Sequence, residues 1–117
     1  MPSEIDLLDR VEALADREWR LLLVETAGGV VGMLALKLSE GVLDQLFVCP
    51  SQFGTGLGLA LFERAKREMP LGFTLHTAAT NGRARKFYER EGMVSNGEGV
   101  HPRTGHPVVY YRWTPTL

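Results

Sequence analysis

The chain has 117 residues, of which 44% are hydrophobic and 23% are charged, and its formal net charge at pH 7 is -1. These values predict one globular domain over residues 1–117, and they give no basic field for nucleic acid or for an anionic membrane. The single cysteine excludes an intramolecular disulfide, and no apolar run approaches the roughly 20 residues that span a bilayer. Because the N-terminus lacks the pattern of a signal peptide, we expect a cytoplasmic protein without nucleic-acid or membrane partners.

The first predicted element is an amphipathic helix over residues 4–16. Ser3 followed by Asp6 resembles a capping box, which marks the start of a helix. Apolar residues then recur among charged ones at helical spacing. They are Ile5, Leu8, Val11 and Ala15.

Three β-strands are predicted next. Two short apolar runs, residues 19–25 and 30–38, flank a Gly-Gly turn and indicate a β-hairpin. A second turn at residues 39–41 leads into another apolar run at residues 42–48. We therefore expect an antiparallel meander of three strands.

The stretch from Leu43 to Met69 joins a strand, a glycine turn and a helix without a linker. The strand stops at Cys49-Pro50, and Gly54, Gly56 and Gly58 follow at every second position. Such a junction presents free backbone N–H groups and the positive end of a helix dipole, which suit a phosphate. The plainer interpretation is that the glycines only make a tight turn. A dinucleotide motif is disfavoured because GTGLGL lacks the third glycine, and a P-loop is excluded because no Gly-Lys-Ser/Thr follows.

The second half of the chain alternates a helix, a strand, a helix and two strands. An apolar stripe over residues 57–69 predicts a helix that ends at a proline, and residues 72–77 predict a strand parallel to the one before the glycines. Asn81 is a good N-cap for a second helix, and Gly92 stands where a C-terminal glycine belongs. Residues 93–113 indicate two more strands joined by a loop.

Two separated motifs resemble the GNAT superfamily of acyl-CoA-dependent N-acetyltransferases. The first, residues 43–65, is similar to the strand, pyrophosphate loop and helix of that family. The second, residues 81–93, is similar to its Asn-x-x-Ala-x-x-Phe-Tyr-x-x-x-Gly-Phe signature. The resemblance implies an α/β fold with a mixed, splayed central sheet flanked by helices. It also implies acetyl-CoA as the acyl donor, a small-molecule or peptide amine as the acceptor, and no metal.

The sequence departs from the family pattern at two places. The Gln/Arg of the pyrophosphate loop falls on Phe53, and Gln52 stands one position early. In addition, the family has a strand and two helices before the hairpin, whereas this chain has room for one helix. We expect an open edge or apolar face near the hairpin, which a homodimer would cover.

The candidate cofactor-binding residues come from the strand, the glycine turn and the second helix. The backbone near Leu46, Phe47 and Val48 is expected to bind the pantetheine like an added strand, and Phe47 or Val48 to hold an oxyanion. The pyrophosphate loop comprises Phe53, Gly54, Thr55, Gly56, Leu57 and Gly58. The resemblance implies that Asn81 also meets the pantetheine. Arg83 and Arg85, with Lys86, are candidates for a CoA phosphate or for solvated surface charge.

Tyr88 is the predicted general acid, because a phenol stays protonated at neutral pH and can give its proton to the CoA thiolate. The alternative is a core tyrosine. Asp44 is the candidate general base, directly or through water, unless it only pairs with a basic neighbour. His76 is another candidate base, although a lone strand histidine is more often packed.

The remaining polar and aromatic residues are weaker candidates for a catalytic or binding role. His101 and His106 lie with Arg103 in the last loop, where substrate binding is possible and a metal is not expected. Cys49 has no neighbouring histidine, which disfavours an acyl-enzyme. The alternating Tyr110, Tyr111 and Trp113 indicate packing. The rival functions are a CoA-binding regulatory module without turnover and a purely structural domain.

Overall fold

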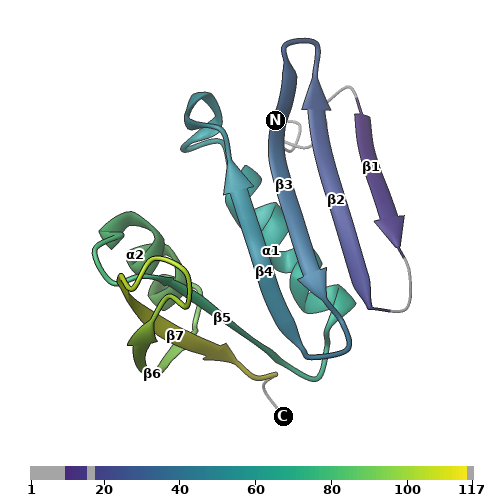
Figure 1. The fold of residues 1–117 in the computed structure, drawn as a ribbon. Coiled ribbons are helices and arrows are strands. Elements are labelled where there is room, and N and C mark those ends of the chain that lie inside the picture. Colours follow the sequence, from purple (N-terminus) through teal and green to yellow (C-terminus); the bar gives the residue numbers. More distant parts are fainter. Residues whose placement is uncertain (1–9, 16–17, 116–117) are drawn as a thin grey trace. The chain divides into compact units, whose positions relative to one another are not determined.

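The computed structural model describes the backbone of residues 10–15 and 18–115, and the side chains of residues 18–115. Within it the chain divides into two compact units, Met1–Pro70 and Leu71–Leu117. They are named unit 1 and unit 2, and each contains several β-strands and one α-helix (Figure 1). Among the helices described, none is long and apolar enough to cross a membrane.

The sheet of unit 1 has four antiparallel strands in the order β1-β2-β3-β4 (Figure 1). The strands are β1 (Arg10–Ala15), β2 (Trp19–Thr26), β3 (Gly29–Lys37) and β4 (Val42–Val48). The pairings of β2 with β3 and of β3 with β4 confirm the predicted meander of three strands.

The predicted N-terminal helix is wrong over residues 10–15, which form β1. This strand pairs antiparallel with β2, from Arg10 opposite Glu25 to Ala15 opposite Arg20. The pairing gives partners to backbone groups along the outer edge of β2, and this non-local gain outweighs the helical spacing of the apolar residues. Residues 4–9 and 16 of the predicted helix lie outside the described part of the chain. Because β1 covers β2, the first hairpin does not supply the open edge that we expected.

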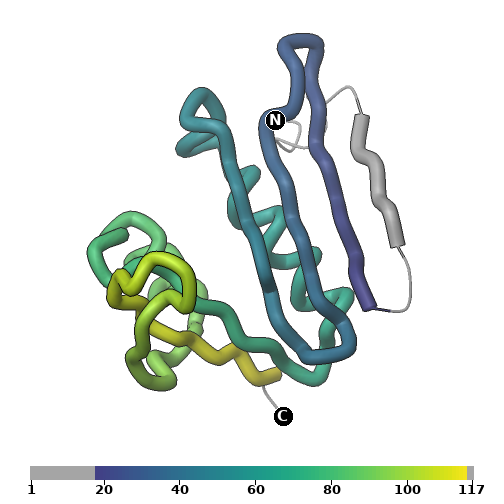
Figure 2. The backbone as a smooth tube through the Cα atoms, in the orientation of Figure 1, coloured from purple at the N-terminus to yellow at the C-terminus, as the bar shows by residue number. Residues whose placement is uncertain are grey.

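Helix α1 (Leu57–Glu68) packs on one face of this sheet, and Figure 2 shows the chain turning back from β4 into it. Its buried side chains are those of Leu57, Leu61, Phe62 and Ala65. Gly32 on β3 permits the close approach, since a Cβ there would lie 3.1 Å from Leu57 Cδ2 and 3.3 Å from Leu61 Cδ1. The helix predicted from the apolar stripe is confirmed, and the core of unit 1 lies between α1 and the sheet.

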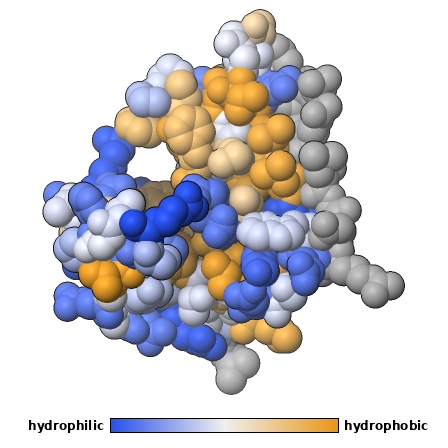
Figure 3. Space-filling view, in the orientation of Figure 1, coloured by the Kyte–Doolittle hydropathy of each residue, from blue (hydrophilic) through white to orange (hydrophobic). Residues whose placement is uncertain are grey.

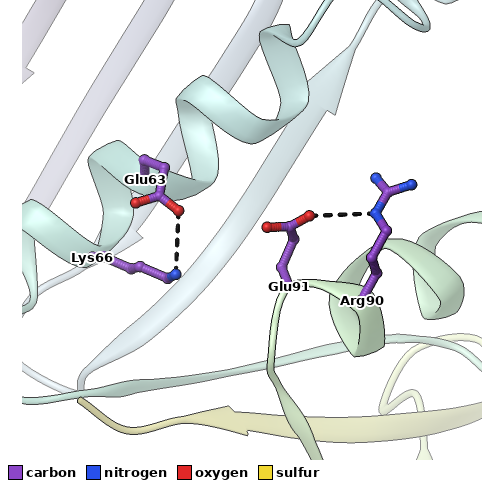
Figure 4. Close-up of polar contacts among 4 residues, drawn as sticks. All are labelled: Glu63, Lys66, Arg90 and Glu91. Atoms are coloured by element: carbon purple, nitrogen blue, oxygen red, sulfur yellow. Dashed lines mark hydrogen bonds and ion pairs between the residues drawn. The ribbon is translucent and has the colours of Figure 1, made fainter. Parts of the chain in front are cut away.

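Ion pairs add to the packing of α1. Arg20 on β2 donates to Glu68 near the end of the helix, and both side chains are partly buried. In contrast, Lys66 and Glu63 pair at 3.2 Å on the solvent side of α1 (Figure 4). Exposed pairs of this kind contribute about 0–1 kcal/mol, so the apolar contacts and the Arg20–Glu68 pair hold the helix on the sheet.

The other face of the sheet in unit 1 carries apolar side chains that α1 does not cover. Leu23, Met33 and Phe47 lie opposite one another on β2, β3 and β4 and form a row across the sheet. Phe47 is 46% exposed, and the other two are half-buried. Figure 3 shows apolar side chains gathered on this side. This row is named the open face, and the expectation that an apolar face near the hairpin is left open stays a prediction.

Unit 2 has three antiparallel strands in the order β5-β7-β6, together with helix α2. The elements are β5 (Phe73–Ala78), α2 (Gly82–Arg90), β6 (Val94–Val100) and β7 (Pro107–Trp113). They confirm the strand, helix and two strands expected after Pro70. The parallel placement of residues 72–77 beside the earlier strand stays a prediction, as does the single domain.

Candidate functional site

The strand that leads into the glycine turn contains a β-bulge. Leu43 lies opposite Leu36 and Gln45 opposite Ala35, so Asp44 is the extra residue on β4. A bulge breaks the alternation of side chains along a strand. The side chain of Asp44 therefore does not follow the regular alternation of the other β4 side chains. Asp44 is exposed to solvent at the bulge.

At the end of β4, successive backbone N–H groups point to opposite edges of the strand. The N–H of Cys49 donates to the carbonyl of Val31, at 2.8 Å, and so points toward β3. Because ladder bonds in an antiparallel pair alternate from residue to residue, the N–H of Val48 is directed to the edge of β4 away from β3. Of the two candidates for the oxyanion, Val48 is the one whose N–H does not belong to the β3 ladder.

A short 3-10 helix, η2 (Pro50–Gln52), separates β4 from the glycines, and sequence reasoning missed it. The signal was Pro50, which is favoured in the first turn of a helix. The backbone carbonyl of Gln52 accepts from both the N–H of Thr55, at 3.1 Å, and its hydroxyl, at 2.6 Å. Gln52 thus closes the turn through its backbone, while Phe53 is 43% exposed.

The glycine turn has the backbone that only glycine adopts readily. Gly54 has φ 83° and Gly56 has φ 91°, both in the left-handed region. Gly56 is the N-cap of α1 and offers no side-chain cap, and none of the first-turn residues is acidic. The backbone N–H of Leu57 donates a hydrogen bond to Thr55 Oγ1 at 3.4 Å.

Two donors at the start of α1 have no acceptor among the described residues. Within the helix, the backbone ladder begins with the N–H of Ala60, which donates to the carbonyl of Gly56 at 3.0 Å. The N–H groups of Gly58 and Leu59 precede it and have no intrahelical partner. Together with the uncompensated helix dipole, they form a site suited to a pyrophosphate.

Helix α2 begins and ends as its sequence predicts. Asn81 Oδ1 accepts from the N–H of Ala84 at 3.1 Å, which confirms the N-cap. Gly92 follows the helix with φ 92°, and its N–H donates to the carbonyl of Glu89. Arg83 is exposed in the first turn. At the end of the helix, Arg90 pairs with Glu91 at 3.3 Å (Figure 4).

Tyr88 is a buried residue of α2. Its side chain is 8% exposed, and its ring centroid lies 5.5 Å from that of Phe87 and 6.0 Å from that of Tyr111. Burial raises the pKa of Tyr88 to about 12, because the phenolate would be poorly solvated. The phenol is therefore fully protonated at neutral pH, as a general acid must be before it acts.

Sequence reasoning missed the role of the Tyr111 hydroxyl. Tyr111 is fully buried, and its hydroxyl donates to Glu89 Oε2 at 2.6 Å and accepts from Arg85 Nε at 3.1 Å. Burial and the bond to Glu89 raise the pKa of Tyr111, and the bond to Tyr111 raises the pKa of Arg85. Arg85, a candidate for a CoA phosphate, thus uses part of its guanidinium within unit 2.

Two of the histidines, His76 and His101, lie close to each other in unit 2. The His76 ring centroid lies 5.7 Å from that of Tyr110 and 6.2 Å from that of His101. His101 Nδ1 accepts from the backbone N–H groups of Arg103 and Thr104, so this histidine shapes the loop before β7. In the described residues, no three side chains able to ligate a metal converge.

The predicted site residues are divided between the two units. Asp44, Val48 and the glycine turn belong to unit 1, whereas Asn81 and Tyr88 belong to unit 2. Cys49 is half-buried and accepts from Ser51 Oγ at 3.4 Å, a bond that lowers the pKa of its thiol. The catalytic and binding roles of all these residues stay predictions.

Comparison with known proteins gives one family and many similar structures. A family model described as an acetyltransferase (GNAT) domain matches residues 17–93. A nourseothricin acetyltransferase superposes with a TM-score of 0.76 at 18% identity, over 86% of this chain and 68% of that one. The spermidine/spermine N-acetyltransferase SpeG from Vibrio cholerae, solved with manganese ions, gives a TM-score of 0.73 at 17% identity, over 96% and 95%.

A third structure was solved with a ligand. It is a protein from Bacillus anthracis named as a streptothricin acetyltransferase, in complex with acetyl coenzyme A, with a TM-score of 0.73 and 21% identity over 86% of this chain and 65% of that one. Comparison with curated protein sequences gives no significant match. At these identities the structures establish the fold, so the predicted α/β class with a mixed, open sheet flanked by helices is confirmed.

Proposed function

Since the chain belongs to the GNAT acetyltransferase family, we propose that it transfers the acetyl group of acetyl-CoA to a primary amine by direct attack in a ternary complex. The observation that carries this proposal is the start of α1. There, two left-handed glycines expose the N–H groups of Gly58 and Leu59 at the positive end of the helix dipole. That arrangement fits the pyrophosphate of CoA and needs no charged side chain at position 53.

In this proposal β4 binds the rest of the donor. The pantetheine lies along the backbone of Leu46 to Val48 as an added strand, and the direction of the Val48 N–H, away from β3, supports this placement. The N–H of Val48 donates to the oxyanion that forms when the amine attacks the thioester carbonyl. A preorganised backbone donor of this kind stabilises the developing charge without moving.

Two side chains transfer the protons of the reaction in this proposal, one as general base and one as general acid. Asp44, or a water that it holds, accepts a proton from the ammonium of the acceptor, and its exposed place at the bulge supports that role. The neutral amine attacks the thioester carbonyl, the C–S bond breaks, and Tyr88 protonates the departing thiolate. Asn81 caps α2 and contacts the pantetheine amides through its remaining amide donors.

A titration and a turnover assay together test the proposal. Acetyl-CoA should bind in a calorimetric titration, and thiol should be released only when a suitable amine from a broad panel is present. Binding without thiol release for any amine would favour a CoA-binding regulatory module. The absence of acetyl-CoA binding would overturn the proposal altogether.

We also propose that the protein is a homodimer that covers the open face. Leu23, Met33 and Phe47 give this face an apolar row, and a partly exposed apolar row of this kind is typical of a protein interface. Light scattering at micromolar concentration should give the mass of a dimer, and Leu23→Glu should give a monomer. Val94→Glu, at an exposed valine of unit 2, is the matched control and should leave the dimer intact. A monomeric wild-type protein would contradict this proposal.

A further inference from the structure

A single buried hydroxyl ties helix α2 to strand β7. Tyr111 Oη donates to Glu89 Oε2 at 2.6 Å, a length typical of a bond to a carboxylate. The same oxygen accepts from Arg85 Nε at 3.1 Å. Arg85 Nη1 in turn donates to the carbonyl of Ala79, at 3.1 Å, just before the Asn81 N-cap. The hydroxyl therefore connects the strand with two positions of the helix and with the loop that precedes it.

The two helix residues in this network lie on either side of the predicted acid. Arg85 and Glu89 are four positions apart and share one side of α2. Tyr88 lies between them in sequence, and its ring centroid is 6.0 Å from that of Tyr111. When both Arg85 and Glu89 are held by one atom, the helix can neither rotate about its axis nor slide along β7 without breaking a bond to a charged group.

We propose that Tyr111 is a positioning residue, whose hydroxyl fixes the rotation of α2 and thereby the direction of the Tyr88 phenol during acetyl transfer. This inference rests on the proposed function, in which Tyr88 protonates the thiolate. Packing alone does not require the hydroxyl, since a phenylalanine ring would fill the same buried space. A misplacement of the acid by a fraction of an ångström lowers the rate of proton transfer while leaving the pyrophosphate loop in unit 1 as it was.

The first test is Tyr111→Phe, compared with Tyr110→Phe as a matched control. Tyr110 is the preceding residue of β7, and its hydroxyl makes no hydrogen bond with the residues that the structure describes. We expect Tyr111→Phe to lower kcat by about 10-fold, with a much smaller change in the KM for acetyl-CoA. Hydrogen–deuterium exchange should be faster in α2 for this variant only. A kcat and an α2 exchange rate equal to those of the wild type would overturn the inference.

The second test separates positioning from a general loss of structure. If Tyr111 acts through Tyr88, then Tyr111→Phe should lower kcat no further in a protein that already carries Tyr88→Phe. Glu89→Gln, which keeps an acceptor for the hydroxyl, should retain more of kcat than Glu89→Ala. Independent, multiplying losses in the double variant would overturn the inference while leaving Tyr88 as the acid. If Tyr88→Phe alone left kcat unchanged, the proposed role of Tyr88 would fail, and the inference with it.

Discussion

Replacing Tyr88 with phenylalanine is expected to lower kcat by about 10-fold or more, with little change in the affinity for acetyl-CoA. The substitution keeps the buried ring and removes only the proton that the thiolate would take. Steady-state thiol release at saturating amine and acetyl-CoA measures kcat, and calorimetry measures the dissociation constant. A loss in kcat without a loss in binding is the signature of an interaction made in the transition state.

The raised pKa of Tyr88 limits how this acid can work. An unperturbed thiol has a pKa of about 8.5, so a phenol of pKa about 12 is the weaker acid of the two. Proton transfer to the thiolate is favourable only if the bound thiolate is also poorly solvated, because burial disfavours every anion. Because the pKa of Tyr88 is about 12, the phenol stays protonated at lower pH. Its deprotonation should therefore cause no loss of kcat until the pH approaches 12.

Tyr110→Phe is the matched control for this prediction as well. Tyr110 is 37% exposed on β7, and the loss of its hydroxyl should leave both kcat and acetyl-CoA binding unchanged. An unchanged kcat for Tyr88→Phe would remove Tyr88 from the mechanism. In that case the proton would have to come from water or from another group.

Replacing Gly56 with alanine is expected to weaken acetyl-CoA binding by about 10-fold or more. Gly56 has φ 91°, where a residue with a Cβ is strained by about 1–3 kcal/mol. The turn relieves that strain by changing its backbone, which redirects the N–H groups of Gly58 and Leu59. A loss of about 1.4 kcal/mol in binding corresponds to a tenfold weaker affinity.

Two controls show whether the loss arises at the pyrophosphate. Gly29→Ala introduces a similar strain at φ 114° in the β2–β3 hairpin, and it should lower stability without changing acetyl-CoA affinity. With S-acetyl-pantetheine, a donor that lacks the pyrophosphate, kcat/KM should be the same for the Gly56 variant and the wild type. Equal losses with both donors would mean that the glycine turn does not bind the pyrophosphate.

Most of the fold follows from local patterns in the sequence. The apolar runs, the turn residues and the helical stripe predict the strands and α-helices from β2 to β7 to within a few residues, because alternation and capping are decided by near neighbours. The caps at Asn81 and Gly92 are examples, since each bond that defines them spans three residues. The glycine turn could be recognised for the same reason.

Apart from the short helix η2, the features that escaped prediction depend on distant partners. Residues 10–15 have helical spacing, yet they form β1 because β2 offers an unpaired edge. The bulge at Asp44 is set by the register of β4 against β3, which no local pattern of β4 reveals. The Tyr111 hydroxyl finds its partners 22 and 26 positions away, so its alternation with neighbouring aromatics indicated packing alone.

The central claim is that the acetyl group passes from CoA to an amine, and the stoichiometry of one reaction tests it most directly. Wild-type protein, acetyl-CoA and an active amine would be combined, and both the free thiol and the acetylated amine would be measured over time. We predict that the two products appear in equal amounts from the first turnover and that neither forms when the amine or the protein is left out. Thiol release without acetylated amine, or no product with any amine, would contradict the account.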